Sequence, residues 1–491
     1  MTPFNSMSLT PELRYALENS LPPDAFILEP EMLRVYECDG LTARKGQPLA
    51  VALPETEEQV RDVVRLCHRH HLPIVPRGAG TGLSGGAQPL SNGLVLSLAR
   101  MNRILEINPD NLSARVEPGV RNLAVSEAAR PHGLHYAPDP SSQIACTIGG
   151  NVAENSGGVH CLKYGLTTNN ILGLRLVTAE GELVQIGGDT LDSPGYDLLA
   201  LLTGSEGLLG IITEITVRLL PLPPSARVML ASFDSVEQAG RAVGAIIAAG
   251  VIPAGLEMMD NRSLRAAEDF VHAGYPVDAA AILLCEVDGT PEEVDEQLAK
   301  VQRILQLCQS TGIRVSRSEE ERNRIWAGRK AAFPAVGRIS PDYYCMDGTI
   351  PRHRLPEVLS RMETMSEKYG LTVANVFHAG DGNLHPLILY DASKPGELAL
   401  AEKFGGDILR LCVEVGGTIT GEHGVGSEKI DQMCVQFQAQ ELQQFHAIKH
   451  AFDESSLLNP GKAVPTLHRC AELGAMHVHN GELPFPDLER F

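Results

Sequence analysis

Several features that would assign a chain to a class at once are missing from this sequence. Its ten cysteines are scattered and no two form a C-x-x-C pair, which excludes the usual spacings of zinc ribbons and iron–sulfur clusters. The longest weakly polar stretch, residues 243–256, is interrupted by glycine and proline, so it cannot span a bilayer. The first residues carry prolines and acids, unlike a basic and apolar secretory leader. We therefore expect a cytoplasmic protein with buried free thiols.

An excess of basic charge is also missing. The 491 residues include 61 acidic and 41 basic side chains, which gives a formal net charge of −20. Such a balance argues against nucleic acid as a partner and against a polybasic membrane anchor. A hydrophobic content of 43% and a charged content of 21% are typical of a globular protein, and the length allows two or three domains.

Glycine, in contrast, is concentrated in a few stretches. The run Arg77–Gly86 contains a G-x-G-x-x-G match at Gly80, Gly82 and Gly85. A Rossmann fingerprint requires a helix directly after the last glycine, whereas here the sequence continues to a strand at 94–98. We therefore reject the Rossmann interpretation. A Gly-rich loop between strands can still offer bare backbone N–H groups to phosphate oxygens.

More loops of this kind follow along the chain. They are the polar turn 138–142, the Gly- and Asn-rich stretch 147–158 and the stretch 204–212. Each could be a tight turn between strands. Their number within a short part of the sequence instead favours backbone groups that wrap a large polar cofactor.

Local patterns predict most of the regular structure. Thr56 opens a capping box, so a helix is expected to run to about residue 71. Hairpins are expected at 104–116 and 171–186. Beyond a linker at 217–224, strands at 227–233 and 280–287 alternate with helices at 235–249 and from Pro291 on. This alternation suggests a ferredoxin-like α+β cap with helices on one face of an antiparallel sheet.

A cluster of histidines and acids marks the expected chemistry. The apolar strand 371–377 leads to His378, a Gly-Asp-Gly turn, and His385. Glu422 and His423 follow between two glycines some forty residues later. Two histidines with one carboxylate commonly hold a catalytic divalent metal, such as Zn, Mn or Fe. The alternative is that these are ordinary histidines of Gly-rich turns.

Four motifs together resemble the FAD-binding domain of the vanillyl-alcohol oxidase superfamily. They are Pro76–Gly82, Ile148–Gly158, Lys163–Gly165 and Gly204–Thr213. Within the superfamily the sequence is most similar to the FAD-linked D-2-hydroxyacid dehydrogenases, and there to the flavin subunits of bacterial glycolate oxidases. The resemblance extends over about residues 20–465 and implies an α+β fold. It consists of a two-subdomain FAD-binding domain of this type and a cap domain, with the flavin ring at their boundary.

The resemblance also implies which residues contact FAD. Those residues are Arg77, Gly78, Ala79, Gly80, Thr81, Gly82, Pro138, Asp139, Ser142, Thr147, Gly149, Gly150, Asn151, Ser156, Gly157, Gly158, Gly207, Gly210, Ile211, Ile212 and Asn459. Some members of the superfamily tether the flavin covalently to a histidine in the first Gly-rich loop. The equivalent position here is near Thr81, and no histidine occurs between His71 and His132, so we expect non-covalent FAD.

For the reaction, the resemblance implies oxidation of glycolate, or of another small D-2-hydroxy acid, by hydride transfer from C2 to flavin N5. His378, His385 and Glu422 would hold the metal and His423 would act as the general base. Arg329, on a helix with the sole tryptophan, would bind the substrate carboxylate. The alternative for that helix is a core tryptophan with solvated arginines. Phe333 and residues 343–347 add no cation, which favours a small monocarboxylate.

The expected organisation has five parts. They are a lead-in (1–45), the FAD-binding domain (46–225), the cap with the metal motif (226–420), a C-terminal return (421–465) and a tail (466–491). The resemblance implies an iron–sulfur subunit and a second FAD-type subunit as partners, passing electrons to quinone, so the protein could lie peripherally at the inner membrane. One alternative is a D-lactate dehydrogenase that works as a single polypeptide. A non-catalytic FAD-binding subunit is another alternative. The joint presence of the three expected metal ligands and of His423 argues against it.

Overall fold

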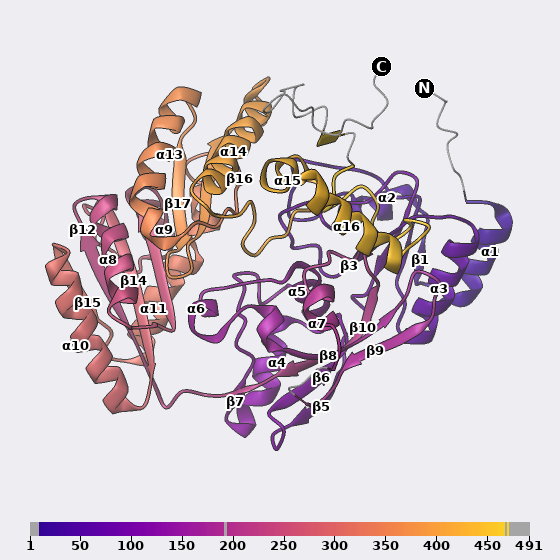
Figure 1. Ribbon diagram of the computed structural model, residues 1–491, viewed down its shortest axis with the longest axis horizontal. Coiled ribbons are helices and arrows are strands. Elements are labelled where there is room, and N and C mark those ends of the chain that lie inside the picture. Colours follow the sequence, from indigo (N-terminus) through magenta and orange to yellow (C-terminus); the bar gives the residue numbers. More distant parts are fainter. Residues whose placement is uncertain (1–8, 191–193, 467–468, 471–491) are drawn as a thin grey trace. The chain divides into compact units, whose positions relative to one another are not determined.

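The computed structural model describes residues 9–190, 194–466 and 469–470, and these residues form two compact units (Figure 1). Unit 1 contains the chain up to Ser156, residues Leu166–Pro221 and the residues from His423 onward. Unit 2 contains Gly157–Gly165 and Leu222–Glu422. The short excursion of residues 157–165 into unit 2 has no counterpart in the expectations drawn from the sequence.

The first half of unit 1 is built on a four-stranded sheet with the order β1-β2-β4-β3. Its strands β2, β3 and β4 are parallel, and β1 pairs with β2 in the antiparallel sense. Helix α3 begins after Thr56, whose side chain accepts the N–H of Gln59 as the capping box predicts. The apolar faces of α1 and α3 pack in the core of this sheet. The bounds are α1 Pro11–Ser20, β1 Phe26–Ile27, α2 Pro30–Leu33, β2 Ala50–Ala52, α3 Glu57–Arg69, β3 Ile74–Arg77 and β4 Leu94–Ser97.

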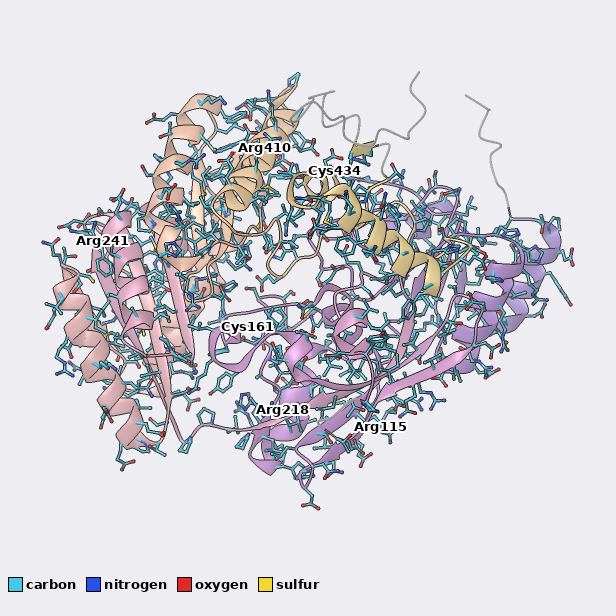
Figure 2. The ribbon with its side chains drawn as sticks, in the orientation of Figure 1. Arg115, Cys161, Arg218, Arg241, Arg410 and Cys434 are labelled. Atoms are coloured by element: carbon cyan, nitrogen blue, oxygen red, sulfur yellow. A yellow bond between two sulfur atoms is a disulfide. The ribbon has the colours of Figure 1, made fainter. Side chains whose placement is uncertain are left out.

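The second half of unit 1 is a five-stranded antiparallel sheet with the order β5-β6-β10-β8-β9, and it contains both predicted hairpins. Residues of β10 alternate between buried and half-buried, so one face packs on a core. On β6, Arg115 (Figure 2) pairs with Glu106 and Glu214 on the two neighbouring strands. The bounds are β5 Ile104–Asn108, β6 Ser113–Val116, α4 Asn122–Ala129, β7 Leu134–His135, β8 Ile171–Val177, β9 Leu183–Gly187, α7 Leu198–Leu202, β10 Ile211–Arg218 and β11 Leu220–Pro221.

The second Gly-rich stretch differs from the loop that its composition suggests. Its first part forms the short helix α5, Ile148–Glu154. The side chain of Thr147 caps this helix at Gly150 N–H, and Asn155 ends it in the left-handed conformation at φ 52°. Buried Ile148 and Val152 hold the helix against the core of the five-stranded sheet. The cap and two apolar anchors thus outweigh the low helix propensity of the paired glycines.

Unit 2 is organised around one seven-stranded antiparallel sheet with the order β15-β12-β14-β13-β17-β18-β16. Its first four strands have the order of a ferredoxin-like sheet, as the sequence predicts, and three further strands extend it. The bounds are β12 Ser225–Phe233, β13 Gly255–Asp260, β14 Ala281–Gly289, β15 Gly312–Val315, β16 Asp342–Cys345, β17 Val373–His378 and β18 Asn383–Tyr390.

The expectation of helices on one face only is wrong for this sheet. Every residue of β13 and β18, and all but the last of β14, is buried. Because successive side chains of a strand point to opposite faces, both faces must be covered. The helices of unit 2 are α6 Cys161–Tyr164, α8 Val236–Ala248, α9 Asn261–Val271, α10 Pro291–Leu307, α11 Glu319–Lys330, α12 Ala332–Val336, α13 Leu355–Tyr369 and α14 Glu397–Glu414.

The cysteines are only partly as expected. Eight are free and six of these are buried, but Cys434 (Figure 2) forms a disulfide with Cys470. Cys434 belongs to α15 (Ile430–Gln436), which precedes α16 (Ala439–Phe452) in the last stretch of unit 1. The two cysteines are 36 positions apart, and their bond attaches the start of the expected tail to the return segment. Most of that tail lies outside the described residues.

Candidate active site

The hairpin of β17 and β18 brings His378 and His385 together. His378 is paired with Asn383 across the hairpin, and His385 lies two residues further along the same face. Both imidazoles are buried, and their ring centroids are 5.0 Å apart at an interplanar angle of 87°. The tight turn between the two strands therefore produces the pair of histidines that the local sequence predicts.

Glu422 completes this group within unit 2. Its Oε1 lies 3.2 Å from His378 Nε2 and 2.8 Å from His385 Nε2. One ligand atom from each of the three residues lies within 4.8 Å of the other two. Two imidazole nitrogens and a carboxylate oxygen facing one point form the ligand set that divalent metals such as zinc, manganese or iron bind. The residues therefore fit a metal ion.

His378 and Glu422 hold each other in their charged forms. Burial alone would raise the pKa of Glu422, but the charge of His378 and hydrogen bonds from both histidines hold that pKa well below its usual value. Burial alone would lower the pKa of His378, but Glu257 and Glu422 raise it well above its usual value. Glu422 is thus kept ionised, as a metal ligand must be.

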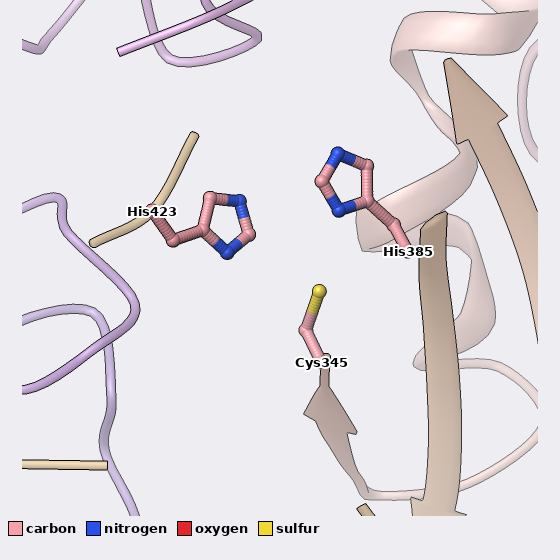
Figure 3. Close-up of side chains that lie close together, drawn as sticks. All are labelled: Cys345, His385 and His423. Carbon is pink, nitrogen blue, oxygen red and sulfur yellow. The ribbon is translucent and has the colours of Figure 1, made fainter. Parts of the chain in front are cut away.

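His385 has different neighbours on its other side. Its Nδ1 lies 3.4 Å from the carbonyl oxygen of Met346. Cys345, the last residue of β16, lies on the strand next to His385, and Figure 3 shows both side chains. The ring of Phe333 approaches His385 edge-on at 6.1 Å. These neighbours are neutral groups, whereas His378 contacts a second carboxylate.

Asp347 fixes the backbone that carries Glu422. Its carboxylate accepts the N–H groups of Gly421 and Glu422 at 3.1 Å each and the hydroxyl of Thr420 at 2.5 Å. Asp347 is fully buried. The position of Glu422 therefore depends on Asp347. In the sequence, this residue was noted only as a member of the stretch 343–347, which contains no cation.

Arg329 lies on α11 and is 1% exposed. Its Nε and Nη2 lie 2.8 and 2.7 Å from Glu257 Oε2, and the other oxygen of Glu257 lies 2.8 Å from His378 Nδ1. A carboxylate within unit 2 therefore already pairs with the guanidinium that was expected to bind the substrate. Glu257, on β13, was missed by sequence reasoning because one glutamate in an apolar strand carries no motif.

The tryptophan of α11 belongs to a second buried cluster. Trp326 Nε1 donates to Glu286 at 2.5 Å, and Arg322 donates two hydrogen bonds of 2.7 Å to the same carboxylate. His160, from the excursion 157–165, lies 3.2 Å from it. This is the core tryptophan that the sequence left open as an alternative. Of the two arginines in the stretch 323–329, Arg324 is exposed as that alternative expects, whereas Arg329 is buried and paired.

In unit 1 the first two Gly-rich stretches meet. A Cβ on Gly78 would lie 2.4 Å from Thr147 Oγ1, so only glycine permits this approach. Gly80, at φ +71°, has the left-handed conformation that glycine favours, whereas Gly82 has open space where a side chain would be. The first loop is thus pressed against the start of α5 and presents bare backbone on its open side. That arrangement fits the phosphates of a dinucleotide.

Several polar side chains expected at the cofactor also form hydrogen bonds that hold these loops. Arg77 Nη1 donates to the carbonyl of Cys38 at 2.8 Å, and burial lowers the pKa of its guanidinium. The side-chain amide of Asn122 donates to Asn151 Oδ1 and to the carbonyl of Pro138, at 3.0 Å each. Asn459 donates to the carbonyls of Gly86 and Glu206 at 2.9 and 2.7 Å. Apart from Gly157 and Gly158, every residue expected at FAD belongs to unit 1.

His423 opens the last stretch of unit 1 and follows Glu422 directly in the sequence. Glu206 fixes the backbone just beyond it: its carboxylate accepts the N–H of Val425 at 2.7 Å and of Gly426 at 2.6 Å. Burial raises the pKa of Glu206, against the effect of these N–H groups and of two nearby lysines. In the sequence, Glu206 was noted only as a member of the motif Gly204–Thr213.

Comparison with known proteins matches both halves of the sequence to described domains. Residues 48–187 match the FAD binding domain, and residues 222–463 match the C-terminal domain of FAD linked oxidases. The glycolate oxidase subunit GlcD of Escherichia coli strain K12 is 64% identical over 476 residues, covering 97% of this chain and 95% of that protein. The D-lactate dehydrogenase of Anaerostipes hadrus is 31% identical, with coverages of 85% and 90%.

A solved structure supports the fold. Substrate-bound p-cresol methylhydroxylase superposes with a TM-score of 0.79 at 19% sequence identity, over 93% of this chain and 97% of that one. At this identity the likeness concerns the fold alone. Together with the match of residues 48–187 to the FAD binding domain, it confirms the expected α+β fold with an FAD-binding domain.

Proposed function

Because this chain belongs to the family of FAD-linked oxidases, we propose that it oxidises glycolate to glyoxylate with FAD as the electron acceptor. The observation that carries the proposal is the 64% identity with a glycolate oxidase subunit over nearly the whole sequence. Oxidation of D-lactate is the second candidate, because a D-lactate dehydrogenase is also similar, although at 31% identity.

The proposed metal ligands are His378, His385 and Glu422. A bound divalent metal supplies a Lewis acid that makes a coordinated hydroxyl more acidic, and FAD supplies the acceptor for hydride. His423, next to Glu422 in the sequence, is the proposed base that takes the proton of the substrate hydroxyl at a ring nitrogen. An ordinary histidine pKa of about 6.5 suits a base at neutral pH.

Arg329 as a direct partner of the substrate carboxylate stays a prediction. Its guanidinium has five N–H groups, of which the one on Nε donates to Glu257, whereas Nη2 lies 2.7 Å from the same oxygen without forming a hydrogen bond. Binding of the substrate by Arg329 would therefore use the remaining N–H groups and leave the ion pair with Glu257 intact.

The proposed partners are an iron–sulfur subunit and a second FAD-type subunit that pass electrons on to quinone. The support is that the E. coli relative is named as a subunit. Within the described part of the protein, no helix combines the length and the apolar character needed to cross a membrane. We propose a cytoplasmic location, at the inner membrane only through the partners.

The proposal is tested by anaerobic flavin reduction. Purified protein is mixed with glycolate or with D-lactate, with and without partner subunits, before and after metal removal by a chelator. We expect the flavin absorbance to bleach faster with glycolate than with D-lactate. Chelation should abolish this bleaching without changing the spectrum of the oxidised flavin, and added divalent metal should restore it.

His385→Ala should abolish both metal binding and reduction, whereas His353→Ala, at an exposed histidine of the same unit, should change neither. Unaltered reduction in His385→Ala would contradict the ligand assignment. Faster reduction by D-lactate than by glycolate would favour the second candidate, and no reduction by either would indicate a non-catalytic subunit.

A further inference from the structure

Glu257 connects a predicted metal ligand to a predicted substrate-binding arginine. It lies on β13, between β14 and β17 in the sheet of unit 2, and is 1% exposed. Its Oε1 lies 2.8 Å from His378 Nδ1, and its Oε2 lies 2.8 Å from Arg329 Nε. A carboxylate this deeply buried requires positive or hydrogen-bonding partners, and these two residues supply them.

The hydrogen bond to Glu257 determines how His378 can bind a metal. An ionised carboxylate only accepts hydrogen bonds, so Nδ1 of the His378 ring must carry a proton. Nε2 would then be the nitrogen that holds a metal, and it lies on the side of the ring that faces Glu422, 3.2 Å away. Metal-binding histidines generally donate their second ring N–H to such an acceptor, which orients the ring and makes its free nitrogen a stronger donor.

The second histidine is held differently. His385 Nδ1 lies 3.4 Å from a neutral carbonyl oxygen, that of Met346. This contact is longer than the 2.8 Å to Glu257 and involves no charge. The two imidazoles of the proposed site therefore differ at Nδ1: that of His378 contacts a carboxylate and that of His385 a backbone carbonyl.

We propose that Glu257 is a positioning residue for the metal ligand His378, and that Arg329 acts on the site by holding Glu257. The inference rests on the metal site of the proposed function. It gives the buried arginine of α11 an electrostatic role in the metal site, where the resemblance alone assigned it to the substrate carboxylate.

The test compares Glu257→Gln with a matched control, Glu286→Gln. Glu286 is equally buried on the neighbouring strand and also pairs with an arginine of α11, Arg322, but it belongs to the separate cluster around Trp326. Chelator-stripped full-length protein that retains FAD is titrated with Zn²⁺ against a chromophoric chelator. Loss of such an outer partner typically weakens metal binding about 10- to 100-fold.

We expect Glu257→Gln to weaken Zn²⁺ binding by that factor and Glu286→Gln to leave it within about threefold of wild type. Wild-type affinity in Glu257→Gln, or an equal loss in Glu286→Gln, would overturn the assignment. If Glu257→Gln does not fold, Glu257→Asp decides in the same way, because it keeps the charge but shortens the reach to His378 by one methylene.

Arg329→Gln separates the two roles of the arginine. If Arg329 acts through Glu257, its loss weakens Zn²⁺ binding, and the double variant Glu257→Gln/Arg329→Gln is no weaker than Glu257→Gln alone. If Arg329 instead acts only on the substrate, Arg329→Gln raises the KM for glycolate and leaves Zn²⁺ affinity unchanged, which would overturn this part of the proposal. His385→Ala tests the proposed function itself, because Zn²⁺ affinity equal to wild type in this variant would refute the metal site. If Zn²⁺ affinity is lost in His385→Ala but retained in Glu257→Gln, only the role of Glu257 is refuted.

Discussion

Replacing Glu206 with glutamine should loosen the segment that follows His423 and leave the rest of unit 1 ordered. Glu206 is 5% exposed, and its carboxylate accepts two consecutive backbone N–H groups, at 2.7 Å from Val425 and 2.6 Å from Gly426. Glutamine keeps one carbonyl oxygen, and its NH₂ group would face the second backbone N–H. One of the two hydrogen bonds is therefore lost, the other loses its charge assistance, and a buried donor is left without an acceptor.

A hydrogen bond to a charged group contributes about 1.5–3 kcal/mol. At about 1.4 kcal/mol per factor of ten, its loss should make local opening about 10- to 100-fold more frequent. The effect should remain local, because Ser427 and Glu428 still donate to the carbonyl of Ser84 at 3.0 and 2.9 Å. Those bonds anchor the far side of the segment to the first Gly-rich loop.

Amide hydrogen exchange on peptides that cover residues 423–430 measures this opening. It is followed at pH 8, because burial raises the pKa of Glu206 and the bond requires the ionised form. Glu127→Gln, at an exposed position of α4, is the matched control. The local role of Glu206 in ordering the segment next to His423 would be refuted by either of two results. Exchange in Glu206→Gln could stay within about twofold of the control, or it could rise equally throughout unit 1.

Further predictions concern the cofactor, the base and pH. Acid precipitation should release the flavin into the supernatant, because no histidine is available near Thr81, and yellow colour that stays in the pellet would contradict non-covalent binding. His423→Asn should keep metal and FAD but slow flavin reduction by about 10²–10⁴-fold; a metal-free variant would make His423 a ligand instead. Burial raises the pKa of Glu286, but hydrogen bonds and charges from His160 and Arg322 lower it to about 2, from an ordinary 4.5. This carboxylate should therefore stabilise the fold above pH 4.5 by about 3 kcal/mol and lose that contribution as the pH falls towards 2. The free energy of unfolding, measured with urea, should therefore depend less on pH over this range in Glu286→Gln than in wild type. An equally steep loss of stability towards low pH in both proteins would exclude Glu286 as its cause.

Local signals in the sequence were sufficient for much of the fold. The side chain of Thr56 caps α3 and that of Thr290 caps α10, as their positions before Glu-rich, apolar-striped segments predict. The turn at 380–382 likewise reverses the backbone so that His378 and His385 lie on one face of a hairpin. In each case the residues that interact are a few positions apart, so their spacing alone determines the geometry.

Other features depended on residues that are distant in the sequence. Glu257 lies 121 positions before His378, and Cys434 is 36 positions from Cys470. A lone glutamate in an apolar strand and two cysteines among ten carry no local signal for their partners. Only the packing of separate strands and helices determined these contacts.

The sequence by itself therefore determined the types of the elements, the glycine-rich loops and the histidine–carboxylate motif. Tertiary structure alone decided that the Gly-Gly-Asn stretch becomes α5, that residues 157–165 belong to unit 2 and that Arg329 is held by a buried carboxylate. The physical reason is one of range. Caps, turns and amphipathic periods act within a few residues, whereas burial and charge pairing depend on which distant segments the fold brings together.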